Sequence, residues 1–354
     1  MSAAPVAVFD GHNDVLLRLY TEGGEAGIAA FLAGTTAGHI DLKRARAGGL
    51  AGGLFAIFPP SPSSAAFMAA MTGEAYDLPL PEPLTLAEGE ASTFAMAAIL
   101  FRLERASAGA LAVCRSVEEI RAAMARGALA AVMHIEGAEA IGPDLDALDV
   151  LHAAGLRSLG PVWSRPNRFG HGVPMRFPSS PDTGPGLTQA GRDLVRAANR
   201  LGILIDLSHI TEQGFWDVAA LSDAPLVATH SNVHAIAPVS RNLTDRQLDA
   251  IRERRGVVGL NFATAFLRPD GRMIADTGLD VMRRHLDALL ERLGEGGVAL
   301  GSDFDGAVVP EALADAAHLP ALFGHLGAHG YGEALIARIA RENWLDLLAR
   351  TWKA

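Results

Sequence analysis

The 354-residue sequence is poor in cysteine, in clusters of basic residues and in long apolar runs. Cys114 is its only cysteine, so the chain can form neither an internal disulfide nor a zinc site made of thiolates, and we expect a reducing compartment. The formal net charge of −10 disfavours nucleic acid and anionic membranes as partners, because both bind basic surfaces. No apolar run approaches the roughly 18 residues of a membrane-spanning helix, and the start lacks a signal-peptide pattern. We therefore expect a cytoplasmic protein.

Apolar residues make up 49% of the chain and charged residues 20%, which is typical of a soluble protein with a large core. Eight apolar segments alternate with segments of helical periodicity, which predicts an α/β fold, a (β/α)₈ TIM-type barrel. An open doubly wound sheet is disfavoured, because no glycine-rich phosphate loop follows the first strand. We expect one domain over 1–354, with 59–110 as an insertion and helical segment after strand two. The eight strands are expected at 6–14, 48–58, 128–137, 156–163, 203–209, 225–231, 257–263 and 298–306.

Ionisable side chains stand where several of these strands end. In an α/β barrel the carboxyl ends of all strands meet at one edge, so these side chains are expected to converge there. A long polar connection, 164–187, exceeds the usual loop length and is expected to lie over this edge as a functional loop. The side chains are His12 and Asp14 from the first strand, Glu136 from the third, His209 from the fifth, His230 from the sixth and Asp303 from the eighth.

Three imidazoles and three carboxylates form a ligand set without sulfur, which suits Zn²⁺ and also admits Mn²⁺ or Co²⁺. Six side chains exceed what one tetrahedral ion uses, so we expect two ions per chain. His12 and Asp14 are two residues apart in a strand, point the same way and would hold one ion. His209 and His230 would hold the other, with Glu136 as a bridge. Such ions lie about 3.5–4 Å apart and share a hydroxide.

We do not expect the histidines at positions 39 and 134 to be metal ligands. A single histidine at a strand end is more often structural than a ligand, so the metal prediction rests on joint placement. A second His-x-Asp pair, His39 and Asp41, precedes a helix and is expected to serve as a cap or at the surface. His134 should lie one layer below Glu136, as a filler of the interior or a hydrogen-bond donor to a ligand.

Six segments in order, GHNDV, HIEGAEAI, IDLSH, THSNVHA, SRNLTD and GSDFDG, resemble the renal or membrane dipeptidases of the amidohydrolase superfamily. The resemblance covers nearly the whole chain. It implies a binuclear zinc barrel that cleaves dipeptides and accepts a D-residue on the carboxyl side. It implies the same ligands as above, with Glu136 bridging the two zinc ions. It further implies that Asp303 handles the proton, that Arg241 clamps the substrate carboxylate, and that the chain forms a homodimer.

The sequence departs from the family at Trp163, where some members have a histidine that helps to hold the scissile carbonyl. His171, in the following loop, is a candidate replacement. Two alternative functions stay open: hydrolysis of another amide, such as a lactam, a cyclic amide or an N-acyl amino acid, and a non-catalytic metal-binding barrel. The second is disfavoured, because no expected ligand is missing. A serine hydrolase is excluded by the absence of a G-x-S-x-G motif.

Overall fold

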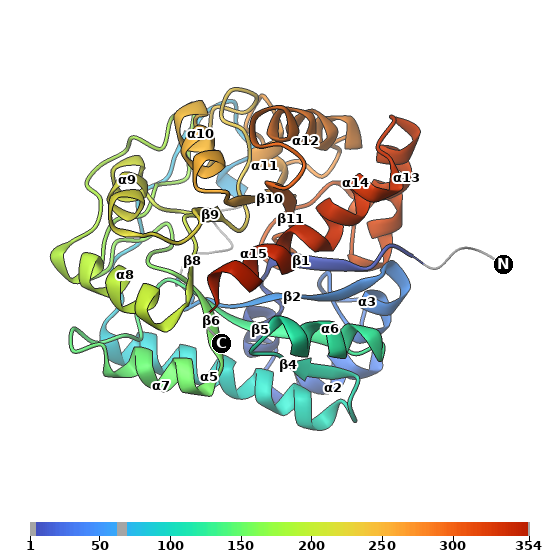
Figure 1. Ribbon diagram of the computed structural model, residues 1–354, viewed down its shortest axis with the longest axis horizontal. Coiled ribbons are helices and arrows are strands. Elements are labelled where there is room, and N and C mark those ends of the chain that lie inside the picture. Colours follow the sequence, from blue (N-terminus) through green and yellow to red (C-terminus); the bar gives the residue numbers. More distant parts are fainter. Residues whose placement is uncertain (1–4, 62–68, 353–354) are drawn as a thin grey trace.

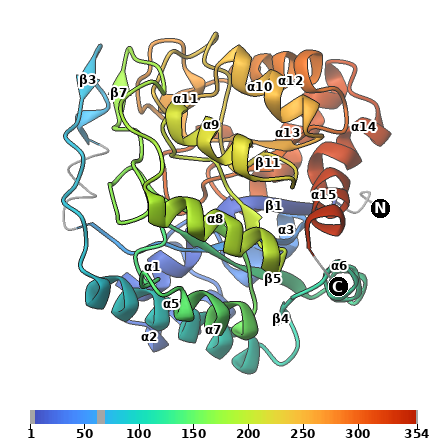
Figure 2. The ribbon, with the colours of Figure 1, turned by 60° about the vertical axis from the view of Figure 1, so that its left-hand side comes forward.

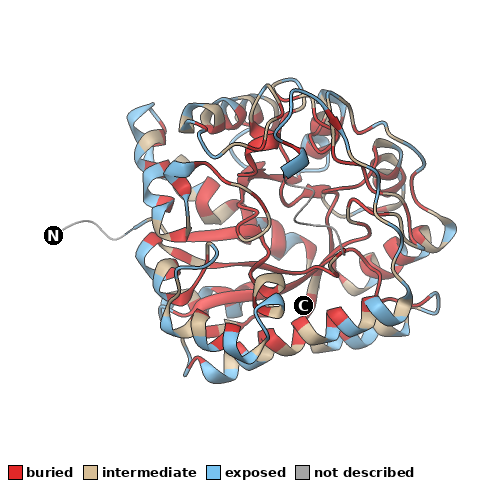
Figure 3. Cartoon of the chain, turned by 180° about the vertical axis from the view of Figure 1, so that it is seen from behind, coloured by how far each residue is buried: buried red, intermediate tan, exposed pale blue. Residues whose placement is uncertain are grey.

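The computed structural model describes residues 5–61 and 69–352. Strands occupy the middle of the molecule and helices lie around them (Figure 1). Buried residues concentrate in the central strands, whereas the outer helices show exposed faces (Figure 3). The molecule is therefore an α/β fold built on a curled parallel sheet, and this part of the prediction is confirmed.

The larger sheet is entirely parallel. Its strands are β1 (Val8–Asn13), β2 (Leu50–Ile57), β4 (Leu111–Val113), β5 (Leu129–Glu136), β6 (Leu156–Gly160) and β8 (Leu204–Ile205). Their order is β1-β2-β5-β6-β8, with β4 beside the first half of β5 and β6 beside its second half. All eight residues of β5 are buried, as expected for a parallel strand that is covered on both faces.

A smaller parallel sheet completes the centre. It has the order β11-β10-β9 and consists of β9 (Val227–Ala228), β10 (Val257–Asn261) and β11 (Val298–Gly301). Isolated parallel bridges join the two sheets at both margins, between Asp206 and Val227 and between Asn13 and Phe304. All eight predicted strands thus lie in two adjoining sheets, and the regular ladders end at the two junctions.

The predicted strands at 203–209 and 225–231 are much shorter in the structure, where only β8 and β9 are regular. The carboxylate of Asp206 accounts for the difference. It accepts hydrogen bonds from the backbone nitrogens of Ser208 (3.0 Å) and Thr229 (2.8 Å) and from the Thr229 hydroxyl (2.6 Å). These bonds occupy backbone donors that a ladder would otherwise use.

A small antiparallel pair lies outside both sheets (Figure 2). It joins β3 (Tyr76–Asp77) to β7 (Arg176–Phe177) and so ties the segment after β2 to the long polar loop. The rest of the predicted insertion at 59–110 contains α5 (Leu86–Ala106) and ends before β4, and its residues 62–68 lie outside the described part of the chain.

Helices cover the outer faces, and several begin at a hydroxyl side chain that caps the first turn. Ser116 accepts from the backbone nitrogen of Glu119 at 3.2 Å, and Thr211 accepts from that of Gly214 at 3.1 Å. No helix within the described ranges is both long and apolar enough to cross a membrane. The helices are α1 (Val15–Thr21), α2 (Glu25–Ala33), α3 (Leu42–Gly48), α6 (Val117–Ala125), α7 (Asp146–Ala154), α8 (Gln189–Leu201), α9 (Glu212–Leu221), α10 (Asp245–Glu253), α11 (Thr264–Leu267), α12 (Leu279–Leu293), α13 (Leu319–Ala328), α14 (Glu333–Ala337), α15 (Asn343–Thr351), the 3₁₀ turns η1 (Glu311–Leu313) and η2 (Ala316–His318), and the π-helical η3 (Arg338–Glu342).

A tryptophan fills the amino-terminal end of the strands. Trp344, at the start of α15, is fully buried in an apolar cluster that includes Phe9 and Leu54, and its Nε1 donates to the carbonyl oxygen of Leu300 at 2.9 Å. A Cβ atom at Gly11 would lie only 2.4 Å from Cζ2 of Trp344, so this strand needs a glycine there. The opposite, carboxyl ends of the strands remain for the functional site.

Candidate metal centre

Glu136, the last residue of β5, lies between His12 on one side and the pair His209 and His230 on the other. Its Oε1 is 3.0 Å from Nε2 of His209 and 3.3 Å from Nε2 of His230, whereas its Oε2 is 3.8 Å from Nε2 of His12. All four side chains are buried. The two oxygens of one carboxylate therefore face different histidines, which is the arrangement that a bridging ligand requires.

The first side of the centre is formed where β1 and β11 adjoin. Nε2 of His12 lies 3.3 Å from Oδ2 of Asp14, and the donor atoms of these two residues and of Asp303 all fall within 4.8 Å of one another. Asp303 is also buried, and its Oδ2 accepts a hydrogen bond from Nδ2 of Asn261 at 2.9 Å. The loop that carries it is fixed by a bond from its backbone nitrogen to the His12 carbonyl oxygen at 3.0 Å.

The second side is formed by His209 and His230, whose Nε2 atoms lie 3.1 Å apart. Their Nδ1 atoms have other partners: Ser164 Oγ is 2.8 Å from Nδ1 of His209, and Thr229 Oγ1 is 2.8 Å from Nδ1 of His230. These hydroxyls orient the rings so that Nε2 of each points toward Glu136, as partners of metal-binding histidines do.

Two of these strand-end residues have left-handed backbone conformations. The φ angle is 67° at His209 and 58° at Asp303, a region that non-glycine residues seldom adopt. His209 lies four residues after β8, and Asp303 lies two residues after β11. Backbone strain of this kind concentrates at functional sites, where the surrounding hydrogen bonds hold it in place.

The donor atoms fit metal ions. Nε2 of His12 and Oε1 of Glu136 are buried and make no hydrogen bond with the described residues, although an unpaired buried polar atom costs about 1–3 kcal/mol. Nitrogen and oxygen donors that converge on one point without sulfur suit Zn²⁺ and similar divalent ions. Bound cations would give these atoms the partners that the chain does not supply.

Burial and neighbouring charges shift the pKa values of the side chains in this centre in different directions. Burial raises the pKa of Glu136 well above its usual value and raises that of Asp303 to about 6. Burial alone would lower the pKa of His12, but the carboxylates of Glu136 and Asp14 raise it to about 10. Burial lowers the pKa of His209 well below its usual value. This imidazole is therefore neutral at pH 7, the form that binds metals.

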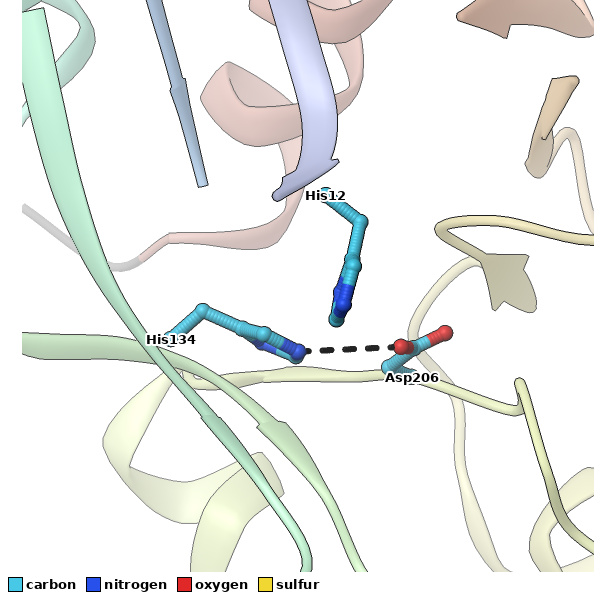
Figure 4. Close-up of side chains that lie close together, drawn as sticks. All are labelled: His12, His134 and Asp206. Carbon is cyan, nitrogen blue, oxygen red and sulfur yellow. Dashed lines mark ion pairs between the residues drawn. The ribbon is translucent and has the colours of Figure 1, made fainter. Parts of the chain in front are cut away.

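A further layer of polar side chains lies beneath the centre. Nδ1 of His134 is 2.8 Å from Ser158 Oγ, and its Nε2 is 3.8 Å from Oδ2 of Asp206. Figure 4 shows His134 and Asp206 facing each other, with the ring of His12 beside them. Burial lowers the pKa of His134 to about 4, so the ring is neutral. The position expected for His134, one layer deeper than Glu136, is confirmed.

The centre opens into a cavity of about 330 Å³, a volume suited to a small molecule. Asp14, Glu136, His209 and Asp303 form its polar floor. Its walls are largely apolar and come from several loops above the carboxyl ends of the strands. The apolar residues of the walls include Leu17, Phe58, Met71, Trp163, Met175, Phe266 and Met273.

Of the three other predicted site residues, one lines the cavity and two lie outside its lining. Trp163 lines the cavity, with its ring centroid 5.7 Å from that of His209. Arg241 is buried beside the centre and lies outside the cavity lining; it donates to the carbonyl oxygen of His230 (3.0 Å) and stacks on Phe266 (5.3 Å). His171 also lies outside the lining, and its Nδ1 is 3.3 Å from the Gly186 carbonyl oxygen.

The second His-x-Asp pair lies apart from the metal ligands. Asp41 caps α3 by accepting from the backbone nitrogen of Arg44 at 2.8 Å, which confirms the expected cap. His39 accepts from the backbone nitrogen of Asp305 at 2.7 Å. It therefore supports the loop that carries Asp303.

Sequence reasoning missed three buried polar residues that support the ligands. Asp206 organises the ends of β8 and β9, Asn261 holds Asp303, and Asp10 accepts from the backbone nitrogen of Ser302 at 2.7 Å. A signal was available for Asp10 and Asp206, because each interrupts an apolar strand, where an unpaired charge is costly. Asn261 also ends such a run.

Comparison with known proteins gives one consistent result. The profile described as membrane dipeptidase (peptidase family M19) matches residues 3–353. A solved metallopeptidase, dipeptidase AC, is 56% identical, covers 99% of both chains and has a TM-score of 0.96. A metallopeptidase from Rhodobacter sphaeroides, solved with a phosphinate mimic of the dipeptide L-Ala-D-Ala, is also 56% identical and has a TM-score of 0.97, with 98% of this chain and 100% of that chain covered. A Klebsiella pneumoniae protein from the pqqA 5′ region is 50% identical over 256 residues, 72% of this chain and 94% of its own.

Proposed function

Since the chain belongs to the membrane dipeptidase family (peptidase family M19) and is a metallo-dipeptidase, we propose that it hydrolyses L,D-dipeptides at a centre of two zinc ions. The observation that carries the proposal is the position of Glu136, with one oxygen toward His12 and the other toward His209 and His230. The complex of the Rhodobacter sphaeroides relative with a mimic of L-Ala-D-Ala supports the D-configuration of the C-terminal residue.

In this proposal His12 and Asp14 would hold one ion, His209 and His230 would hold the other, and Glu136 would contribute a carboxylate oxygen to each. When bound, such ions lower the pKa of a water molecule and polarise the carbonyl group of the substrate. Ser164 and Thr229 keep the two histidine rings in the orientation that this requires.

Asp303 moves the proton. Its carboxylate takes a proton from the attacking water and returns it to the amine nitrogen of the leaving amino acid, so no covalent intermediate with the chain is needed. The bond from Asn261 fixes one oxygen of this carboxylate. Burial raises the pKa of this carboxyl group, which favours its holding the proton during the reaction.

We assign recognition of the free carboxylate of the dipeptide to Arg241, which lies outside the cavity lining but stacks on Phe266, a residue of that lining. It is a buried cation beside the centre, and its Nε has no hydrogen-bond partner among the described residues. A guanidinium binds a carboxylate through two parallel bonds, and a longer peptide has an amide at that point instead. The apolar cavity walls, with Met71, Met175 and Met273, favour substrates with apolar side chains.

For the fold, we propose that the two parallel sheets together form a complete eight-stranded barrel. The bridges at Asp206 and Asn13 support it, because they join the two sheets at both margins. We take 1–354 as one domain with an insertion at 59–110. A homodimer is the family-level expectation, which sedimentation would test.

The function is tested with the zinc-loaded enzyme and a substrate panel. We expect L-Ala-D-Ala and L-Leu-D-Leu to be hydrolysed and N-acetyl-D-alanine, a lactam and L-Ala-D-Ala-D-Ala to be left intact. Metal analysis of the same sample should give two zinc ions per chain. Asp303→Asn should keep both ions and lose most turnover. Preferred hydrolysis of the N-acetyl amino acid or the lactam would replace this proposal with that of a different amidohydrolase.

A further inference from the structure

A second group of potential metal ligands lies on the outer surface, where α12 and α13 pack together (Figure 1). It consists of Asp280 in the first turn of α12, His325 in the last turn of α13 and His329 directly after α13. Their donor atoms all lie within 4.8 Å of one another. None of the three lines the cavity described above.

The distances suit one tetrahedral ion. Nε2 of His325 lies 3.3 Å from Oδ1 of Asp280, and Nε2 of His329 lies 3.9 Å from the same oxygen. Bonds of about 2.0–2.1 Å to a tetrahedral ion place neighbouring ligand atoms about 3.3 Å apart. The two histidines are four residues apart along the helix direction, which puts them on one face, and their ring centroids are 4.3 Å apart.

The hydrogen bonds of His325 and His329 do not use the Nε2 atom of either ring. Nδ1 of His329 lies 2.8 Å from the carbonyl oxygen of His325, to which it donates, so the lone pair of the neutral ring is on Nε2. Nε2 of His325 is buried and has no hydrogen-bond partner among the described residues. The last carbonyl groups of α13 add partial negative charge at this end of the helix, which favours a cation.

One cation already contacts the group. Nε of Arg283 donates to Oδ1 of Asp280 at 3.2 Å, while its NH1 donates to Asp287 at 2.7 Å. The guanidinium competes for the carboxylate and leaves both imidazoles untouched. Asp280 is therefore the weakest of the three ligands, and the two histidines should contribute most of the affinity.

We propose that Asp280, His325 and His329 bind one transition-metal cation of the Zn²⁺ class, with water as the remaining ligand. Two imidazoles and one carboxylate select Zn²⁺, Ni²⁺ or Cu²⁺ over Mg²⁺ and Ca²⁺, which take oxygen ligands. Asp280 and His329 are exposed, so the ion exchanges with solvent and binds less tightly than ions in the buried centre. The bound ion joins α13 to α12 and stabilises the packing of the two helices.

The test compares zinc binding by the wild type and by His325→Ala/His329→Ala. Zn²⁺ is titrated by calorimetry into enzyme previously equilibrated with zinc and dialysed, and zinc per chain is then counted by mass spectrometry. We expect one additional ion per chain in the wild type and an affinity at least about tenfold lower in the double variant. Asp280→Asn should weaken binding less, and an excess of Ca²⁺ should not compete.

His318→Ala is the matched control, because His318 is an exposed histidine that pairs with Asp315 on a neighbouring turn. It should keep the additional ion, and dipeptide hydrolysis should be the same in all these variants. Equal zinc binding by the wild type and the double variant would overturn the proposal, as would equal loss in His318→Ala. The result is a difference between variants, so it does not depend on how many ions the buried centre holds.

Discussion

Burial and neighbouring side chains together determine the pKa of Asp303. Burial raises its pKa to about 6, the charge of Asp14 raises it too, and the hydrogen bond from Asn261 acts in the opposite direction. The bond lowers the pKa because it stabilises the ionised form. Asn261 does not line the cavity, yet it acts directly on the carboxylate that we assign to proton transfer.

Asn261→Ala should move the acid limb of the pH profile. Without the donor, the pKa of Asp303 rises above about 6, so the active carboxylate is lost at a higher pH as the solution is acidified. We expect the acid limb of kcat/KM for L-Ala-D-Ala to shift upward by up to about one pH unit. Profiles from pH 5 to 8 measure it. Asn242→Ala, which removes a buried asparagine that donates to the Ala237 and Phe266 carbonyls, should leave the limb in place. An unshifted limb in both variants would remove Asp303 from the proton-transfer role.

Arg241→Lys should weaken the binding of dipeptides. Lysine keeps the charge but presents no planar pair of donors, so the bidentate contact with the substrate carboxylate is lost. We expect KM for L-Ala-D-Ala to rise at least about tenfold, with zinc content unchanged. Arg246→Lys is the control, because Arg246 stacks on Trp216 at the surface. An unchanged KM in Arg241→Lys would assign carboxylate recognition to another residue.

At single positions, the sequence predicted residues that are recognisable by type and place. His12, His209 and Glu136 stand at the ends of apolar runs, and these ends do converge. Asn261 and Asp206 act through hydrogen bonds to segments tens of residues away in the chain. Hydrophobic periodicity carries no information about such partners, so these two residues were found only in the structure.

Among the elements, α15 fills the amino-terminal end of the strands with the side chain of Trp344. Two strand glycines, Gly11 and Gly259, allow this close approach. A Cβ atom at Gly259 would lie 2.0 Å from the carbonyl oxygen of Thr229 and 3.0 Å from Cζ2 of Trp344. The helix and the glycines therefore form one packing unit.

Trp344→Ala should destabilise the whole fold. Truncation leaves a large cavity beneath the strands and removes a hydrogen bond to Leu300, and we expect a loss of about 3–5 kcal/mol in the free energy of unfolding. Denaturant unfolding of the zinc-loaded protein measures this. Trp352→Ala removes a partly exposed tryptophan near the end of the same helix and should cost clearly less. Similar losses in the two variants would contradict the role given to Trp344.

The lengths of elements were predicted less well than their existence. The runs at 203–209 and 225–231 are apolar enough for full strands, yet Asp206 binds the backbone of both and ends their ladders early. The pairing of β3 with β7 has no sequence signal either, because two residues on each side are too few for any pattern. In both cases contacts between distant segments decide where regular structure ends.

For the molecule as a whole, bound ions should contribute substantially to stability. They would give partners to Nε2 of His12 and Oε1 of Glu136, which are buried and have no hydrogen-bond partner among the described residues. At about a thousandfold excess over its Kd, one ion adds about 4 kcal/mol to the free energy of unfolding.

Removal of the ions by a chelator should therefore abolish activity and lower the midpoint of thermal unfolding. Scanning calorimetry before and after dialysis against the chelator measures the change, and added Zn²⁺ should restore both properties. His325→Ala/His329→Ala serves as a control, since the loss should persist when only the buried centre remains. An identical midpoint with and without ions would contradict a stabilising role of the buried centre.

In the global arrangement, the sequence predicted eight of the nine strands of the two parallel sheets but missed the short β4, and it does not specify where the sheets adjoin. Alternation of apolar and helical segments located all eight. Whether the first and last strands adjoin depends on register between β1 and β11, which rests on contacts such as that of Asn13 with Phe304. Residues nearly three hundred positions apart form this junction, and no local pattern in the chain specifies it.

The tryptophan at the far end of the strands also has a kinetic consequence. With that end filled by Trp344, the amino acids released by hydrolysis leave on the side by which the next dipeptide arrives. Free amino acids at high concentration thus obstruct the incoming substrate. Sustained turnover then depends on how quickly other reactions consume what this enzyme produces.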